Sequence, residues 1–384
     1  MNRIYILCAG ASLGLRFDTN LVESIIPPYG GLMSDGFFYY AKRFEQEILT
    51  SRKKLDPDTL LDVSNIQDNQ WVKDYLREND LEEDIEKIFK DKEFSGKVNV
   101  EALLNFMENK SEEENEKEKD EATWIARRVA DLASVFSPVH SIIYSAIKMV
   151  SFYCYSPLYR KFVREIIQEG DNIITFNWDD LLEEELYAAS NWDYWDGYGF
   201  KVKGVKRQGD SVYTLPPRGL CSKNLIFKPH GSMNWYRKRP SQLVDDSIYV
   251  WIAANRSMRG QGHYSQQQCE SVDYQNQAGV YFTPPGERKD MRFPEIWKQI
   301  RSQLETADEL IFIGFAFNEY DVEAEQFFQD VTYRNDVRIL IVNPDHLTES
   351  RYASIFQRPV LKICSTFGEY VNYYKEMGYL QNCK

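Results

Sequence analysis

The stretch NIITFNWDDLLEEELY (residues 172–187) changes from one hydrophobic pattern to another, and this change predicts how the chain folds. Its first five residues contain two adjacent isoleucines, as a short buried strand does. Three leucines then follow at helical spacing, after an acidic start that suits the positive end of a helix dipole. The stretch therefore predicts a strand that passes directly into a helix.

Strand patterns and helix patterns also alternate elsewhere, towards both ends of the chain. Continuous apolar runs such as LIFIG (310–314) and ILIV (339–342) are typical of strands buried on both faces of a parallel sheet. A crossover helix is expected between them, at 319–332. We predict an α/β fold with a Rossmann-like, doubly wound parallel sheet. Its strands are expected at 4–7, 172–176, 225–228, 309–313, 338–342 and 360–364.

The middle of the chain has a different sequence pattern, and this difference predicts the domain organisation. Residues 35–168 read almost entirely as helical pattern and form a predicted insertion within an α/β domain made of 1–34 and 169–384. The acidic run at 108–121 is interpreted as a solvated or disordered connector. Residues 188–224 and 236–295, rich in Gly, Pro, Ser and Tyr, are expected to form loops and short hairpins over one end of the sheet.

Composition excludes several classes of function. The formal charge of −13 argues against tight nucleic-acid binding by this chain alone. No apolar stretch approaches the roughly 20 residues that span a bilayer, and no signal-peptide pattern opens the chain, so we expect a cytoplasmic protein without membrane contact. The six cysteines form no CxxC pair and the four histidines are scattered, so no zinc module and no metal cofactor are expected.

Small and polar residues follow the predicted strands where each one ends. The loop Ala9-Gly10-Ala11-Ser12 would let backbone N–H groups approach a pyrophosphate, although a tight turn without ligand explains it equally well. His230 is a candidate general base, against the commoner structural role of a lone histidine. Gly314 opens a second small-residue turn, and Asn343 could bind a ribose hydroxyl. Asn177 follows the predicted strand at 172–176. Its simplest role is to cap the helix that comes next, because Asn is a favoured N-cap residue.

Taken in order, these segments resemble the sirtuin-like family. That family has a GAGxS loop, a TxNxD strand end, an HG pair, a GxS turn and an asparagine after a late strand. The resemblance implies that Asn177 orients the nicotinamide ribose and a water, and that Asp179 contacts the nicotinamide carboxamide. The matching positions here are Ala9-Gly10-Ala11-Ser12, Thr175, Asn177, Asp179, His230-Gly231, Gly314-Phe315-Ala316 and Asn343.

The chain departs from the family pattern at several positions, and these departures indicate which branch of the family it resembles. Ala9 replaces the first glycine of the loop, and Ala316 replaces the serine of the GxS turn. GLRFD (14–18) matches the family's GIPDFR-like segment only loosely, and the two CxxC pairs of protein-deacylating sirtuins are absent. The combination looks more like the bacterial antiphage branch, in which a zinc-less sirtuin-like domain destroys NAD to abort infection. Several members of that branch work beside a second protein, commonly a HerA-like ATPase or an Argonaute-type sensor.

The leading hypothesis is therefore an NAD glycohydrolase, with NAD as substrate and no metal. Asn177 and His230 would be catalytic: Asn177 would hold a water and His230 would accept a proton. The other matched residues would bind NAD. Two alternatives are an NAD-dependent deacylase or ADP-ribosyltransferase, and a non-catalytic module that binds NAD or ADP-ribose. An aromatic content of 14% and the lack of an evident sensor domain lead us to expect a homo-oligomer, tetrameric or larger, that docks on a HerA-like ATPase or another sensor.

Overall fold

The fold is taken from a computed structural model of the chain. It describes residues 1–12, 16–17, 69–79, 81, 99–115, 139, 143, 146–147, 154–189, 192–208, 212–217, 221–238, 248–253, 277–278, 281–282, 294–317 and 322–382.

The centre of the fold is a six-stranded parallel sheet with the order β15-β14-β13-β1-β4-β7. The six predicted strands are confirmed to within one residue at each end, because runs of branched apolar residues buried on both faces leave little ambiguity. The strands are β1 (Arg3–Leu7), β4 (Asn172–Thr175), β7 (Ile226–Phe227), β13 (Glu309–Ile313), β14 (Arg338–Val342) and β15 (Leu361–Cys364).

The order of the strands contains one reversal of direction. From β1 the chain adds β4 and then β7 on one side, after which it returns to add β13, β14 and β15 on the other side. The reversal therefore falls between β1 and β13, which are direct neighbours, with Leu7 opposite Ile313 at their ends. In open α/β sheets the crevice at such a switch point, beyond the carboxyl ends of the strands, is where ligands bind.

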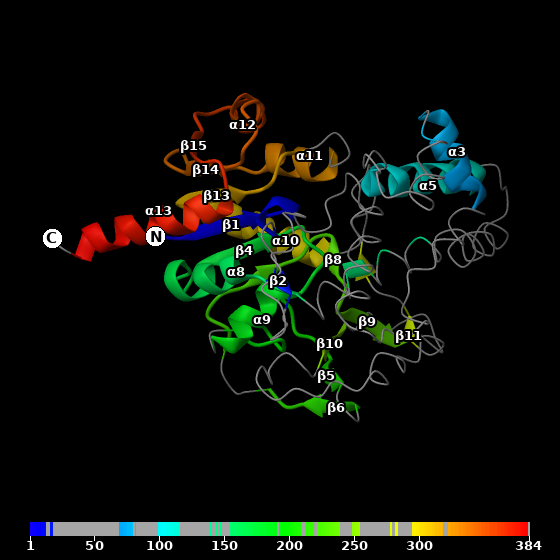
Figure 1. The fold of residues 1–384 in the computed structure, drawn as a ribbon, viewed down its shortest axis with the longest axis horizontal. Helices are drawn as coiled ribbons and strands as arrows, with labels where there is room; N and C mark the ends of the chain where they lie inside the picture. The colour runs from blue at the N-terminus through cyan, green and yellow to red at the C-terminus, as the bar shows by residue number, and fades with distance from the viewer. Residues whose placement is uncertain are drawn as a thin grey trace. The chain divides into compact units, whose positions relative to one another are not determined.

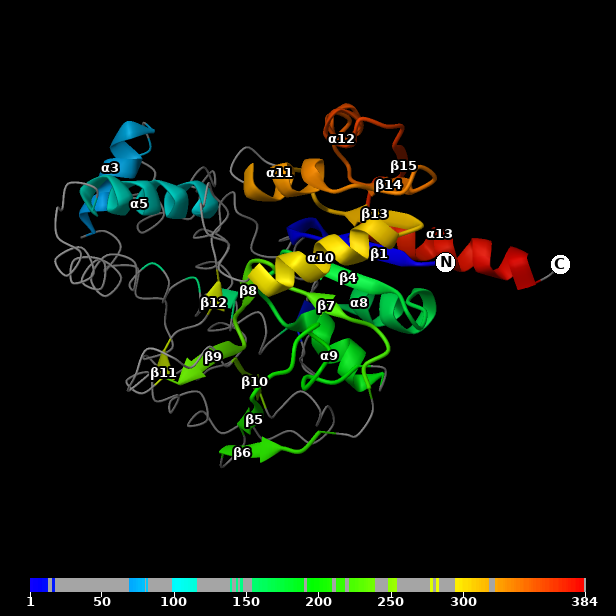
Figure 2. The ribbon, with the colours of Figure 1, turned by 180° about the vertical axis from the view of Figure 1, so that it is seen from behind.

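Helices cover the two faces of this sheet in two groups (Figures 1 and 2). The first group lies in front of the sheet in Figure 1: α8 (Pro157–Lys161) with its continuation η4 (Phe162–Ile166), α9 (Leu181–Ala188) and α13 (Phe367–Asn382). The second group is α10 (Pro294–Thr306), α11 (Val322–Asp330) and α12 (Thr348–Phe356), and α10 is in front in Figure 2. The predicted doubly wound α/β fold is confirmed, and α11 is the predicted crossover helix, with 319–321 outside the described residues.

Aromatic side chains join the sheet to the helices on both faces. On one face Tyr5 of β1 meets Phe162 edge-on, with 4.9 Å between ring centroids, and Phe162 in turn meets Phe367 of α13 at 5.3 Å. On the other face Phe312 of β13 packs edge-on against Tyr352 of α12 at 4.9 Å. Each such pair contributes about 0.5–1.5 kcal/mol beyond the area it buries. Much of the aromatic content is thus core packing.

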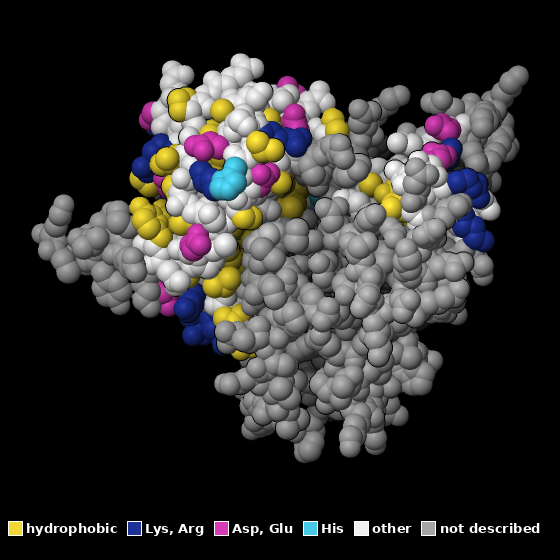
Figure 3. Space-filling view, turned by 45° about the horizontal axis from the view of Figure 1, so that its top comes forward, with side chains coloured by type: hydrophobic (Ala, Val, Ile, Leu, Met, Phe, Trp, Pro, Cys, Tyr) yellow, Lys and Arg dark blue, Asp and Glu magenta, His cyan; other side chains and the backbone are white. Residues whose placement is uncertain are grey.

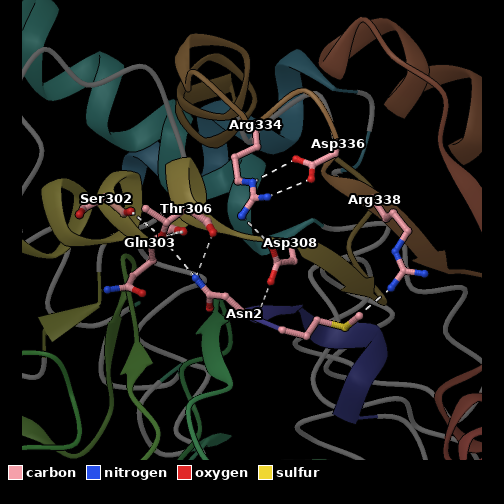
Figure 4. Close-up of polar contacts among 9 residues, drawn as sticks. Asn2, Ser302, Gln303, Thr306, Asp308, Arg334, Asp336 and Arg338 are labelled. Carbon is pink, nitrogen blue, oxygen red and sulfur yellow. Dashed lines mark hydrogen bonds and ion pairs between the residues drawn. The ribbon is translucent and has the colours of Figure 1, made fainter.

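A polar network holds the amino-terminal ends of the strands together, away from the carboxyl edge (Figure 4). The backbone N–H of Asn2 donates to Asp308 at 2.6 Å, and Arg334 donates to the same carboxylate at 2.7 Å. Deeper in the same edge, Arg3 pairs with Asp171 at 2.7 Å, and both side chains are almost fully buried. Because these residues precede or begin β1, β4, β13 and β14, the network fixes the start of the sheet.

The region predicted as loops and short hairpins is more ordered than expected, which corrects that prediction. It contains a second, five-stranded sheet of order β11-β9-β10-β5-β6, in which β10 pairs with β5 in parallel. Its inward side chains Val205, Trp235 and Val250 are buried, but the surrounding Gly, Pro and Tyr residues conceal this alternation in the sequence. The strands are β5 (Gly204–Gln208), β6 (Val212–Leu215), β9 (Trp235–Lys238), β10 (Tyr249–Ala253) and β11 (Gln277–Ala278).

Two shorter strand pairs complete the described β-structure. β8 (Gly231–Ser232) pairs with β12 (Tyr281–Phe282) in antiparallel orientation. β2 (Arg16–Phe17) pairs with β3 (Cys154–Tyr155), also antiparallel. β8 begins directly after His230, so its pairing helps to hold the segment that follows β7.

The chain divides into two compact units. One comprises 1–31, 150–283 and 288–384, and the other comprises 32–149 and 284–287. Residues 150–168, which the sequence assigned to the insertion, belong to the first unit, because α8 and η4 pack on α9 and α13. The prediction that the insertion forms a helical domain is otherwise untested.

The described part of the second unit includes two helices in contact, α3 (Gln70–Glu78) and α5 (Val100–Asn115). Asn69 caps α3, where its side chain accepts from the N–H groups of Trp71 and Val72. Residues 108–115 of the acidic run continue α5 as helix, so this part of the run is not a disordered connector, and 116–121 lie outside the described residues. Among the helices described, none is both long and apolar enough to cross a membrane.

Candidate functional site

The candidate site begins where β1 and β13 end, at the switch point of the sheet. Gly10, in the short helical turn η1 (Ala9–Ser12), lies against Gly314, which follows β13 and has φ of +64°. A Cβ added to Gly10 would be 2.6 Å from the Cα of Gly314, and one added to Gly314 would be 2.5 Å from the backbone of Gly10. The two backbones therefore touch, and both positions require glycine.

Asn177 follows β4 at the same edge of the sheet and points back towards β1. Its amide nitrogen donates to the carbonyl of Cys8 at 3.2 Å and to the hydroxyl of Tyr159 at 3.2 Å. Its backbone N–H donates to Thr175 Oγ1 at 3.2 Å. The cap residue of α9 is Asp180, so the alternative that Asn177 caps this helix is wrong. The side chain instead ties the end of β4 to the end of β1 and to α8.

Asp179, predicted to contact a carboxamide, lies between Asn177 and the first turn of α9. Its carboxylate oxygen Oδ1 accepts from the backbone N–H of Leu181 at 3.1 Å, which satisfies one of the first amides of the helix. The side chain is partly exposed, whereas Asn177 and Thr175 are buried. Asp179 therefore has a helix-start role in this structure, and its predicted ligand contact stays a prediction.

His230 comes to this edge from β7 and is buried, with 3% of its surface exposed. Its ring packs edge-on against Phe176, with centroids 4.8 Å apart, and Phe176 precedes Asn177. On its other side Phe176 lies 4.7 Å from the ring of Phe315, next to Gly314. One aromatic side chain thus links the predicted base, the predicted amide and the turn after β13.

Asn343 follows β14 and supports the turn after β13. Its amide nitrogen donates to the carbonyl of Phe315 at 3.1 Å, and its Oδ1 accepts from the N–H of Asp345 at 2.9 Å. The hydroxyl of Tyr352 donates to the same Phe315 carbonyl at 2.9 Å, and burial raises the pKa of this phenol well above its usual value. Two neutral donors therefore fix the carbonyl of Phe315, the residue after Gly314. The predicted contact of Asn343 with a ribose is untested.

The structure brings segments from five predicted positions to one edge, although not every group that was expected to face a ligand is available. The N–H of Ala11 donates to Cys8, and the N–H of Gly314 donates to Val342, so both are engaged in backbone hydrogen bonds. Ala316 is exposed. The side chains of Ala9 and Ser12 lie outside what the structure describes.

Three residues at this edge escaped the sequence reasoning. Tyr159 binds the side chain of Asn177 from a helix that the sequence assigned to the insertion. Lys228 and Glu183 form an ion pair 2.7 Å long that is entirely buried. Two signals could have pointed to this pair, namely a lysine in a strand end just before His230 and a glutamate among the buried leucines of α9.

Among the described residues, no group of three or more His, Cys, Asp or Glu side chains is arranged to hold a metal ion. Where side chains are described on the face shown in Figure 3, basic and acidic groups are interspersed. This surface is not the concentrated basic patch that phosphate backbones require.

No protein-family model matches the chain, and no curated protein matches it. Solved structures of three mutants of a Sir2 homologue in complex with ADP-ribose are similar to it, each at 14% identity. They cover 64%, 64% and 62% of this chain and 74%, 74% and 72% of their own, with TM-scores of 0.34, 0.32 and 0.33. Similarity at this level carries no conclusion about activity, and the fold rests on the strand order and connections described above.

Proposed function

We propose that this chain binds NAD at the carboxyl edge of its parallel sheet and hydrolyses it to nicotinamide and ADP-ribose. One observation carries the proposal: Asn177 and His230 leave neighbouring strands and are joined through Phe176 beside the contact between Gly10 and Gly314. A neutral amide, an imidazole and two closely apposed backbones at a switch point suit a dinucleotide whose ribose bond is to be broken.

The chemistry follows from the charge that develops in the substrate. When the bond between nicotinamide and ribose breaks, its electron pair leaves with nicotinamide, and the ribose acquires oxocarbenium character. A buried site that fixes both parts lowers this barrier by orientation and electrostatics. Water then forms a bond to the same ribose carbon and gives up a proton, for which His230 is the acceptor.

Asn177 suits the placement of that water. Its amide nitrogen donates to Cys8 and Tyr159, and an amide oxygen can accept a hydrogen bond from water or a ribose hydroxyl. An amide does this without adding charge beside a developing cation. We assign Asn177 to water and ribose placement, and His230 to proton transfer.

The activity is tested by incubating the purified chain with NAD, with and without extract from phage-infected cells. Nicotinamide and ADP-ribose are quantified over time. Equal release of both products supports hydrolysis. If neither product appears under either condition, the proposed activity is wrong.

The alternatives differ in what becomes of the ADP-ribose part. Adding an acyl-lysine peptide or a protein acceptor to the same assay separates deacylation and ADP-ribosyl transfer from hydrolysis. A non-catalytic NAD or ADP-ribose module would bind ADP-ribose by calorimetry and release no nicotinamide. The proposed roles of Asn177 and His230 favour catalysis, since binding alone needs neither a placed water nor a base.

Tyr159 offers a test of how Asn177 is held. Replacing it by phenylalanine removes the hydroxyl that accepts from the Asn177 amide but keeps the ring in the core. We expect the free energy of unfolding to fall by about 1 kcal/mol and NAD turnover to fall by about 10-fold. Thermal denaturation and the nicotinamide assay measure the two effects. Wild-type turnover in the folded variant would show that Tyr159 does not position Asn177.

Activity is also expected to survive chelators. The proposed steps use an amide, an imidazole and water, and the six cysteines form no CxxC pair. Turnover and melting temperature measured before and after dialysis against EDTA are expected to agree. Loss of either, restored by added zinc, would reveal a metal site.

The biological setting that we propose is defence against phage, with NAD destruction as the abortive step. An enzyme that destroys NAD has to be restrained until infection, and we propose that a homo-oligomer, tetrameric or larger, docks on a HerA-like ATPase or another sensor for this purpose. Light scattering on the purified chain tests the assembly. A stable monomer that is fully active without a partner would contradict this prediction.

A further inference from the structure

A buried ion pair connects the two segments that carry the proposed catalytic residues. Lys228 lies at the end of β7, two residues before His230, and its side chain is 0% exposed. Its ammonium group is 2.7 Å from the carboxylate of Glu183, which is 1% exposed in the first turn of α9. The same ammonium donates to the carbonyl of Asp179, two residues after Asn177.

Further hydrogen bonds also join these segments. The N–H of Met233 donates to the carbonyl of Trp178 at 2.9 Å, and the hydroxyl of Ser232 donates to that carbonyl at 3.4 Å. The two successive carbonyls of Trp178 and Asp179 are therefore both held by the segment after β7. Lys228 supplies the charged hydrogen bonds of this set, which are about twice as strong as neutral ones.

The surroundings of Glu183 show that the pair is kept in spite of its cost. Burial raises the pKa of Glu183, while the Lys228 ammonium opposes this, and the nearby Asp180 and Asp179 raise it further. Tyr198 donates to the same carboxylate at 3.4 Å, and Asn234 donates to the Tyr198 hydroxyl at 3.3 Å. A buried ion pair is seldom needed for stability, because a well-packed apolar pair often serves as well.

We infer that Lys228 and Glu183 are a positioning pair, which sets the placement of Asn177 relative to His230 for NAD cleavage. The inference rests on the proposed function for its catalytic consequence. Its geometric content is independent of that function: without the pair, the segment after β7 loses its charged hydrogen bonds to α9 and to the Asp179 carbonyl.

The test separates positioning from stability. Lys228→Met alone leaves a buried carboxylate uncompensated, so its melting temperature is expected to fall by about 5–10 °C. The double variant Lys228→Met/Glu183→Leu removes both charges, and most of that loss is expected to be regained. The double variant is nevertheless expected to keep a kcat about 10- to 100-fold below wild type, with a smaller change in KM, because the catalytic groups are misplaced.

A second buried pair serves as the matched control. Arg3 and Asp171 are also 2.7 Å apart, with side chains 6% and 2% exposed, but they lie at the amino-terminal edge of the sheet. The variant Arg3→Met/Asp171→Leu is expected to retain wild-type kcat once folded. A general cost of removing buried charges would affect both double variants alike.

Hydrogen exchange gives a readout that does not depend on activity. Amides in 177–180 and 230–234 are expected to exchange faster in Lys228→Met/Glu183→Leu than in wild type, and at the wild-type rate in the control. Wild-type exchange in both segments, or wild-type kcat in the folded double variant, would overturn the inference. If wild-type protein does not cleave NAD, the proposed function fails, and the exchange rates alone decide whether the pair positions these segments.

Discussion

Replacing His230 or Asn177 by alanine is expected to reduce NAD cleavage by about 100-fold or more in a protein that remains folded. Each side chain would act on the transition state, His230 by accepting the proton of the attacking water and Asn177 by holding that water. The measurement is nicotinamide released per minute at saturating NAD, with circular dichroism to establish folding.

Matched controls for these variants lie on the described surface of the same domain. His346, after β14, and Asn372, in α13, are both exposed. His346→Ala and Asn372→Ala therefore remove the same kinds of side chain and are expected to leave turnover unchanged. Wild-type rates in folded His230→Ala and Asn177→Ala would refute the site assignment.

Replacing Gly314 by alanine is expected to lower the free energy of unfolding by about 3 kcal/mol or more. Two effects add: φ of +64° disfavours any side chain by roughly 1–2 kcal/mol, and the new methyl group would lie 2.5 Å from the backbone of Gly10. To accommodate the methyl group, the turns after β1 and β13 have to separate at the switch point. Chemical denaturation measures the loss, and the same displacement is expected to weaken NAD binding.

Substitutions at two other glycines measure the backbone effect and the close contact separately. Gly170 has φ of +92° with nothing within 4 Å of an added Cβ, so Gly170→Ala measures the backbone term alone, roughly 1 kcal/mol. Gly10→Ala adds a methyl group 2.6 Å from Gly314 without a positive φ, which measures the close contact alone. If Gly314→Ala costs no more than Gly170→Ala, the two backbones do not pack as described.

The parallel sheet could be predicted from the sequence because its strands are local signals. The runs 310–313 and 339–342 are continuous and apolar, and they form the main part of β13 (Glu309–Ile313) and β14 (Arg338–Val342), whose bounds are as predicted. The second sheet could not be predicted in the same way. Its pairing of β10 with β5 joins residues more than 40 positions apart within a sequence dominated by turn-forming residues.

Some residues of the candidate site could likewise be predicted from the sequence, and others could not. Asn177, His230 and Gly314 stand directly after predicted strands, so the rule that parallel strands end at one edge was enough to gather them. Tyr159 and the pair Lys228–Glu183 reach this edge through side-chain contacts across separate helices and strands, which no sequence spacing encodes. The backbone hydrogen bonds that occupy the N–H groups of the turns likewise depend on geometry alone.

The central claim is that NAD is bound and cleaved at the carboxyl edge where β1 meets β13, and the position of bound ADP-ribose tests it most directly. In a crystal structure of the wild-type chain soaked with ADP-ribose, we expect the diphosphate beside the turns that contain Gly10 and Gly314, and the terminal ribose beside Asn177. ADP-ribose bound away from this edge, or no binding at millimolar concentration, would contradict the claim.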